Sequence, residues 1–515
     1  MAAFLLIPLG IAVWEARDWS PLTRPQGYAF IITVAVALVA GTILQFTCRA
    51  ARDEQRTREG FAIVTLGWAL LALLGSIPFF VYFLATRDVS APHHIFTAFT
   101  DAYFEIMSGF TTTGATILTN IEGLPRDLLF WRSLTHWLGG MGIITLALAI
   151  FPAMGIAGYQ MFRGEVPGPS ADRLRPRLAE TAKVLWGVYL LLSAAETTLL
   201  MLGGMDLFDA LCHTFGTMAT GGFSTRSASI GAYQSAYIDW VVILFMFLAG
   251  TNFLLHYRVL FRRDWLAVRN NREFHFYAGT VLVAILITMA VLHFDGVPAA
   301  EISEQHYQFD SRPTVAHATH VAAEQEKLSS FDGLLRHSAF QVVAITTTTG
   351  YGTADFDVWP RSIGLLLVVL MFWGGCAGST GGGMKMIRIL VVLKVAWREL
   401  RRMVRPRLIA PLKVRGYTVE EKRITNVVGF FILFVALFIV CSIIMTLFIP
   451  DLTTAVAAVA ATIANIGPGL SGVGSTQTYA WIPTAGKWVL ILCMLLGRLE
   501  IFTVIVLLRP SFWKR

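Results

Sequence analysis

Four short turns in this sequence combine glycine with small polar residues, and each lies between long apolar stretches. Glycine adopts backbone conformations closed to other residues, so successive carbonyl oxygens can point one way, and a threonine hydroxyl adds a further oxygen. Carbonyl rings from four loops can replace the water that a potassium ion loses. The turns therefore predict a site for a dehydrated cation. The predicted ion-binding residues are Thr112, Thr113, Gly114 and Ala115; Ala219, Thr220, Gly221 and Gly222; Thr348, Thr349, Gly350 and Tyr351; and Asn465, Ile466, Gly467 and Pro468.

The four turns differ in sequence. The third, residues 348–352, is most like a potassium-channel filter, whereas the fourth has Ile466 before its glycine and Pro468 after it. We expect an asymmetric ring, because the side chains of the fourth turn add no hydroxyl oxygen. By subtraction of residue numbers, the successive leading glycines are 107, 129 and 117 residues apart when they are taken as Gly114, Gly221, Gly350 and Gly467.

A second glycine-rich stretch, residues 374–385, interrupts an apolar span. Each glycine in a helix interior costs about 1 kcal/mol relative to alanine, so this density should unravel the helix. A Walker A phosphate loop is excluded, because no Gly-Lys-[Ser/Thr] follows and the flanks are apolar spans. Close helix packing through small residues is the remaining alternative. We predict a flexible loop under the turns, with the candidate residues Gly374, Gly375, Gly378, Ser379, Thr380, Gly381, Gly382, Gly383 and Lys385.

Charged residues also occur in apolar segments. Arg498 lies inside the last apolar span, where an ionised group is costly unless it faces water or a partner. On the path of a cation it would repel that ion; a salt bridge to another part of the chain is the alternative. Glu500 is not an obvious partner, because residues two apart face different sides of a helix. Asp101 and Glu105 share a helix face, where they either attract cations or cap and solvate that helix.

The elements that must position these residues are membrane spans. The chain of 515 residues is 55% hydrophobic and 14% charged, with a mean hydropathy of +0.63. Soluble domains carry about 25% charged residues, so lipid must be the solvent for much of this surface. The net charge of +8 comes from arginine-rich and lysine-rich loops that alternate with basic-poor ones. This positive-inside pattern places the basic loops in the cytoplasm and argues against nucleic-acid binding.

The apolar spans repeat. Two leading spans, at 2–14 and 28–48, precede four units, each with a long span, a segment of about a dozen residues, a glycine turn and another long span. Segments this short cannot cross the bilayer, and irregular backbone at membrane depth must line a shared cavity. We therefore predict an all-α polytopic membrane protein with four pseudo-symmetric membrane-pore-membrane repeats around one pore, after two extra helices. The predicted divisions are residues 1–60, 61–165, 166–270, 271–415 and 416–515, with the interrupting loop in the third repeat.

Other polar residues do not indicate catalysis. The five cysteines are scattered and form no CxxC pair, so neither a disulfide framework nor a zinc site is predicted. The polar segment 295–330 is expected to be a solvated outer loop, because its histidines lack tight metal-ligand spacing. His136 and Asn252 are interpreted as packing residues. A membrane-bound transferase would need a cluster of catalytic residues, and the sequence offers none, so we predict that the protein is not an enzyme.

Several motifs together resemble the Trk/Ktr/HKT superfamily of potassium transporters, and within it the bacterial TrkH-type subunit. They lie at residues 58–61, 104–115, 131–142, 218–224 and 494–500, and the resemblance covers nearly the whole chain. In that superfamily, glycine at the leading filter position accompanies potassium selectivity. The two leading spans are similar to TrkH rather than to the shorter KtrB.

The resemblance implies more than the residues alone do. It implies potassium uptake across the bacterial inner (cytoplasmic) membrane, with the loop at 374–385 as an intramembrane gate and Arg498 beside it. It implies a homodimer and a cytoplasmic TrkA-like nucleotide-binding regulatory subunit, so that NAD or ATP acts only through that partner and no covalent cofactor is expected. A cation-coupled secondary transporter, a symporter of potassium with sodium or protons, is the alternative.

Overall fold

The computed structural model describes residues 1–16, 25–47, 57–86, 94–149, 174–298, 314–406, 412–414 and 417–513. The described chain is helical, apart from two short strands, β1 (Lys413–Val414) and β2 (Tyr417–Thr418), which pair antiparallel. The predicted all-α class is therefore confirmed. The predicted divisions at 165/166 and 415/416 lie outside the described residues.

Among the described residues, five helices are long and apolar enough to cross a membrane, or seven if each of two bent helix pairs counts as one span. The five are α2 (Pro25–Thr47), α3 (Thr57–Thr86), α7 (Leu174–Leu202), α12 (Arg272–Asp295) and α18 (Glu421–Thr446). Most of the residues in their apolar windows are not buried inside the bundle. Such surfaces suit lipid, since each helix supplies the roughly 20 apolar residues that a bilayer requires. A shorter apolar helix, α1 (Ala2–Ala16), packs against α2.

Four shorter helices lead into the glycine turns and are largely buried. They are α4 (His94–Phe110), α8 (Leu207–Met218), α15 (Phe331–Thr346) and α19 (Leu452–Ile463). Three of them begin at side-chain caps: the side chains of Asp206, Ser330 and Asp451 accept hydrogen bonds from backbone N–H groups of the first turn. These caps explain why the helices begin after polar residues in an otherwise apolar setting.

The helices predicted as the second spans of the repeats are bent more often than the sequence indicates. Beside α5 (Arg126–Ala149), the structure has α9 (Ala236–Ala249) bent by 102° from α10 (Phe253–Arg262), and α20 (Thr484–Arg498) bent by 111° from α21 (Phe502–Ile505) and η8 (Val506–Leu508). Only the break between α16 (Arg361–Phe372) and α17 (Met386–Val404) was expected. Asn252 causes the first bend by capping α10, and left-handed backbone at Glu500 and Ile501 causes the other.

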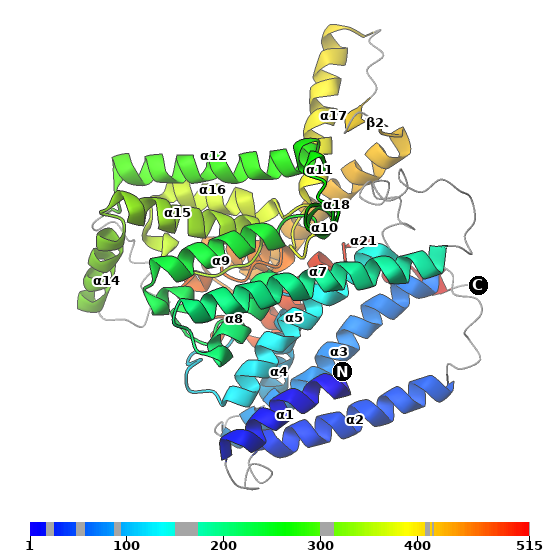
Figure 1. The fold of residues 1–515 in the computed structure, drawn as a ribbon, viewed down its shortest axis with the longest axis vertical. Helices are drawn as coiled ribbons and strands as arrows, with labels where there is room; N and C mark the ends of the chain where they lie inside the picture. Colours follow the sequence, from blue (N-terminus) through cyan, green and yellow to red (C-terminus); the bar gives the residue numbers. More distant parts are fainter. Residues whose placement is uncertain are drawn as a thin grey trace.

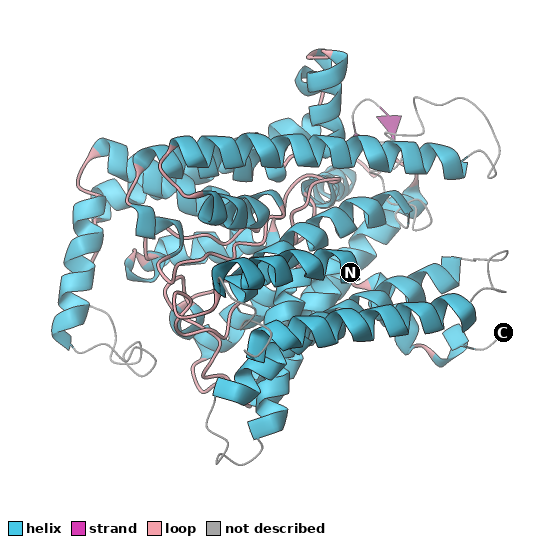
Figure 2. Ribbon diagram, turned by 60° about the horizontal axis from the view of Figure 1, so that its bottom comes forward, coloured by secondary structure: helices cyan, strands magenta, loops and turns pink. Residues whose placement is uncertain are grey.

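Figure 1 shows α17, β2 and the start of α18 projecting from the bundle, and Figure 2 shows loops gathered among the helices of its body. The polar segment at 295–330 is not simply a solvated loop, because it contains α14 (Thr314–Lys327), which packs against α15. The other elements are η5 (Ser229–Tyr233), α11 (Leu266–Arg269), η6 (Phe356–Val358), η7 (Ser471–Val473) and α22 (Pro510–Trp513).

Candidate ion pathway

The four glycine turns have the same backbone geometry. In each, a backbone N–H donates to the carbonyl five residues earlier at 2.8 Å: Thr113 to Ser108, Gly221 to Gly216, Thr349 to Ala344, and Ile466 to Ala461. The residue directly before each N–H donor has left-handed backbone, with φ between 51° and 63°: Thr112, Thr220, Thr348 and Asn465. The glycine directly after each N–H donor also has positive φ, between 73° and 99°: Gly114, Gly222, Gly350 and Gly467.

This geometry corrects the alignment of the second turn. Gly222, rather than Gly221, occupies the position of Gly114, because it carries the positive φ. Gly221 instead corresponds to Thr113, since both donate the hydrogen bond that closes the turn. Two adjacent glycines made these positions indistinguishable in the sequence.

The glycines bring the four turns together in a closed ring. A Cβ atom added to Gly114 would collide with the carbonyl oxygen of Gly221, in the second turn. A Cβ atom added to each of the other three glycines would likewise meet a carbonyl oxygen of the next turn. Gly222 would meet that of Thr349, Gly350 that of Ile466, and Gly467 that of Thr113. Each turn therefore lies against the next with its backbone in close contact. Glycine is required here both by its positive φ and by this close approach.

Side chains also hold the turns in place. The hydroxyls of Thr111 and Thr113 lie 2.8 Å apart, as do those of Thr347 and Thr349. The amide nitrogen of Asn465 donates to the Thr113 hydroxyl at 3.0 Å and to the Met494 carbonyl at 2.9 Å. The fourth turn thus replaces the missing threonine with an amide that ties it to the first.

Two tyrosines brace the turns. The Tyr351 hydroxyl lies 3.0 Å from the carbonyl of His213 and 3.1 Å from that of Phe223, so the side chain of this predicted ion-binding residue supports the second repeat. Tyr479, which sequence reasoning missed, donates to the Gly467 carbonyl at 2.7 Å. Nothing in the spacing of Tyr479 distinguishes it from other aromatic residues in the chain.

The predicted loop between α16 and α17 lies directly against the turns. The Gly382 N–H donates to the Thr348 hydroxyl at 2.6 Å, and the Thr380 hydroxyl lies 3.0 Å from the Met218 carbonyl, at the end of α8. A Cβ on Gly382 would press on the Ala464 carbonyl, before the fourth turn. The loop therefore contacts the third turn and the C-terminal ends of α8 and α19.

Other contacts anchor the loop at its ends. The Cys376 N–H donates to the Gly250 carbonyl at 2.8 Å, in the break between α9 and α10. The Ala377 N–H donates to the Glu273 carboxylate at 2.6 Å. The Lys385 ammonium donates to the Gly381 carbonyl, within the loop itself. These bonds satisfy backbone groups that an unravelled helix would otherwise leave unpaired.

Arg498 is 2% exposed and binds backbone rather than a carboxylate. One guanidinium nitrogen donates to the Thr380 carbonyl of the loop at 2.7 Å, and another lies 3.4 Å from the Gly139 carbonyl on α5. Within the described part of the chain, no carboxylate forms a salt bridge with it. As expected, Glu500 is not its partner; Glu500 pairs with Arg388 on α17.

Asp101 and Glu105, the two acidic residues of α4, form buried ion pairs. Asp101 lies 2.7 Å from the Lys487 ammonium, and Glu105 lies 2.6 Å from the guanidinium of Arg132. The expectation that they attract cations or solvate the helix is therefore wrong. The sequence did not reveal their partners, because Arg132 and Lys487 lie on other elements at separations that no local pattern encodes.

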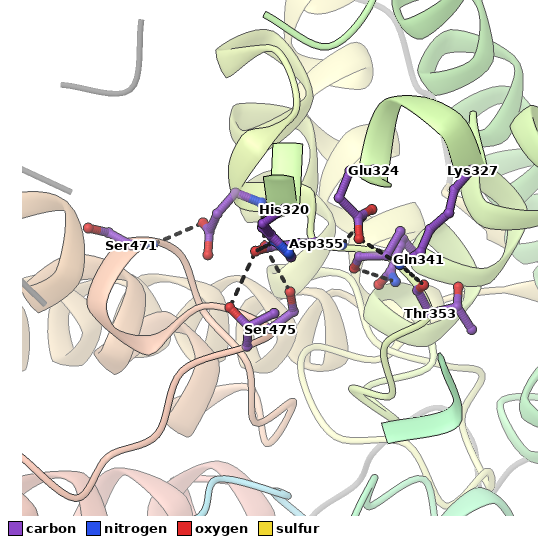
Figure 3. A network of polar contacts seen from close by, with 11 residues as sticks. His320, Glu324, Lys327, Gln341, Thr353, Asp355, Ser471 and Ser475 are labelled. Atoms are coloured by element: carbon purple, nitrogen blue, oxygen red, sulfur yellow. Dashed lines mark hydrogen bonds and ion pairs between the residues drawn. The ribbon is translucent and has the colours of Figure 1, made fainter. Parts of the chain in front are cut away.

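A polar network joins α14 to the loops that follow the third and fourth turns (Figure 3). The His320 ring donates to the Asp355 carboxylate at 3.0 Å, and the Ser475 hydroxyl donates to the same carboxylate at 3.1 Å. Burial raises the pKa of Asp355, but hydrogen bonds from His320 and Ser475 outweigh it, so the pKa is below its usual range. Burial and the charge of Asp355 raise the pKa of Asp357 well above its usual range.

His136 and Asn252, interpreted from the sequence as packing residues, each contact neighbouring backbone groups. His136 lies 2.8 Å from the Gly109 carbonyl and against the Phe223 ring, as expected for a packing residue, whereas Asn252 caps α10. Across the described residues, no group of three histidine, cysteine or acidic side chains could hold a metal ion.

A bundle of apolar helices with a backbone-lined ring of turns in its interior is the architecture of a membrane transport protein. The chain belongs to the TrkH family of cation transport proteins, whose family profile matches residues 26–515. It is 40% identical to the Trk system potassium uptake protein TrkH of Salmonella typhimurium over 95% of this chain and 92% of that protein. It is 31% identical to the Trk system potassium uptake protein TrkG of Escherichia coli, over 95% of this chain and 92% of that protein.

A solved structure has the same fold. The crystal structure of the potassium transporter TrkH from Vibrio parahaemolyticus superposes with a TM-score of 0.82 at 35% identity, covering 100% of this chain and 96% of that one. The family consists of transport proteins, so the prediction that the chain is not an enzyme is confirmed.

Proposed function

We propose that this protein takes up potassium through the ring of four turns, which acts as its selectivity filter. The observation that carries the proposal is the mutual contact of the four turns, in which each glycine backbone lies against a carbonyl of the next turn. Carbonyl oxygens from four loops can replace the hydration shell of a potassium ion. The named relatives are potassium uptake proteins, which supports potassium as the cation.

The loop at 374–385 and Arg498 form the gate in this proposal. The loop contacts the third turn through Gly382 and the end of α8 through Thr380, and Arg498 holds the Thr380 carbonyl. A guanidinium buried next to the ion path opposes a cation by charge, and movement of the loop would carry Thr380 away from it. Opening therefore requires that Arg498 releases the loop or moves with it.

The remaining parts of the proposal come from the family. The chain acts as a homodimer in the bacterial inner membrane, and a TrkA-like nucleotide-binding subunit on the cytoplasmic face controls the gate. NAD or ATP binds that subunit, and this chain carries no covalent cofactor. A partnership with other Trk components is consistent with the Trk system proteins that the chain resembles.

Complementation tests the uptake. A bacterium that lacks potassium uptake should grow at low potassium when it produces this protein with a TrkA-like subunit. Failure both with and without that subunit, by protein that reaches the membrane, would refute the proposed function. Uptake into liposomes that follows the potassium gradient without a sodium or proton gradient distinguishes a channel from a symporter.

The gate has a separate test. Arg498→Ala should raise rubidium flux into liposomes in the absence of the regulatory subunit, because the charge and the Thr380 bond are both lost. Arg401→Ala, on the exposed part of α17, is the control. Equal or lower flux through Arg498→Ala, at matched protein content, would contradict a gating role.

A further inference from the structure

Glu196 is a buried acid that the proposed pathway does not use. It lies on α7, the first span of the second repeat, and is 0% exposed. Neither of its side-chain oxygens accepts a hydrogen bond. Ionisable residues inside membrane spans are rare and usually functional, because an unpaired charge there is costly. Glu196 thus differs from Asp101 and Glu105, which both have basic partners.

The polar group next to Glu196 suits a protonated carboxyl. Thr217, near the end of α8, interacts with the Glu196 side chain. The Thr217 hydroxyl already donates its proton to the His213 carbonyl at 2.9 Å. A hydroxyl has one proton and two lone pairs, so the Thr217 oxygen can accept from a protonated carboxyl but has no proton left for a carboxylate.

Among the residues that the structure describes, no positively charged group acts on Glu196. Tyr189 on α7 and Tyr351 of the third turn both interact electrostatically with Glu196. The negative charge of a Glu196 carboxylate would disfavour ionisation of either tyrosine. The charged and titratable groups on the helices packed against α7 are held by other partners; they include Arg132 and His136 on α5, Asp209 and His213 on α8, Asp239 on α9, and His256 and Arg258 on α10.

The site lies directly behind two of the turns. The Thr217 carbonyl accepts the Thr220 N–H at 2.9 Å, so the residue that faces Glu196 also shapes the second turn. Tyr351 belongs to the third turn and bonds the carbonyls of His213 and Phe223. A negative charge on Glu196 would therefore act on groups that hold the second and third turns in place.

We propose that Glu196 is a proton-binding site that couples potassium flux to pH. The conducting arrangement has a neutral Glu196 carboxyl, whose O–H faces the Thr217 oxygen. When this O–H bond breaks at alkaline pH, the proton goes to water and the carboxylate turns toward water, which withdraws support from the second and third turns and lowers flux. The inference rests on the proposed conduction, but the site can also be observed without any flux.

Infrared spectroscopy tests the site directly. The full-length protein in lipid should show the carbonyl stretch of a protonated carboxyl at neutral pH, and Glu196→Gln should remove that band. Glu421→Gln is the matched control, because Glu421 is an exposed carboxylate paired with Arg398 and should leave the band unchanged. A spectrum in which Glu196→Gln removes no protonated-carboxyl band would overturn the proposal, whether or not the protein conducts.

Rubidium flux into liposomes tests the coupling. Wild-type flux should fall with rising pH, approaching a tenfold loss per pH unit above the midpoint, as expected for one titrating group. Glu196→Gln keeps the neutral form and should conduct at a level independent of pH. The same pH profile in Glu196→Gln and wild type would overturn the coupling. Absence of wild-type flux at every pH would instead count against the proposed conduction and leave the infrared result to decide on the site.

Discussion

Replacing Gly350 by serine tests the closed ring of turns most directly. Gly350 has φ +73°, and its new Cβ would collide with the Ile466 carbonyl and approach the Pro468 ring at 2.7 Å. The left-handed backbone costs an L-residue about 1–2 kcal/mol. Overpacking against a rigid backbone adds about 1–3 kcal/mol. The total of roughly 2–5 kcal/mol disfavours the intact ring by about 30- to 4,000-fold.

Rubidium and sodium fluxes into liposomes measure this effect. Gly350→Ser should lose most rubidium flux or its preference for rubidium over sodium, because the carbonyls of the third and fourth turns separate. Gly352→Ser is the matched control: its nearest neighbours, Ser475 and Gln341, lie 3.9 and 4.0 Å from the added Cβ, and its φ is not positive. If folded Gly350→Ser protein conducts as selectively as the wild type, the contact between the turns does not determine selectivity.

Two further predictions concern charge. Glu105→Gln leaves Arg132 buried without its partner, which should cost about 3–5 kcal/mol and lower the melting temperature. Glu420→Gln, in an exposed pair, should cost less than about 1 kcal/mol in the same assay, and equal shifts would contradict the reasoning. The pKa of Asp357 is raised by folding, so its contribution to stability is present below its ordinary value of 3.8 and is lost as pH rises through the raised pKa. Between acidic and neutral pH, the melting temperature of Asp357→Asn should therefore fall less than that of the wild type. Melting temperatures that change in parallel with pH in the two proteins would refute this.

Local patterns were sufficient to predict the turns and most spans. Apolar length identifies a membrane helix without knowledge of its neighbours, and glycine with threonine before it marks a turn whose backbone must be special. The loop at 374–385 was predictable for the same reason, since its glycine density contradicts a continuous helix. These features depend on residues that are close together in the chain.

Features that depend on distant partners were not predictable. The ion pairs of Asp101 and Glu105 join residues far apart in sequence, and charge alone does not say which side chains meet. The bend after Ala249 was missed because Asn252 was interpreted as a packing residue, although it also caps the next helix. The position of Gly222 in the second turn required φ angles, because a neighbouring glycine fits the same pattern.

The closing contact of the ring has a consequence for biosynthesis. Gly467 of the fourth turn meets the Thr113 carbonyl of the first, and Asn465 bonds the Thr113 side chain across 352 residues of sequence. The ribosome must therefore complete nearly the entire chain before the first turn finds its last neighbour. Until then, the buried helices that carry the first three turns lie in the membrane with one side uncovered. A chain truncated before the fourth turn would keep its spans but leave this gap open, and membrane proteases should remove it faster than the full-length protein.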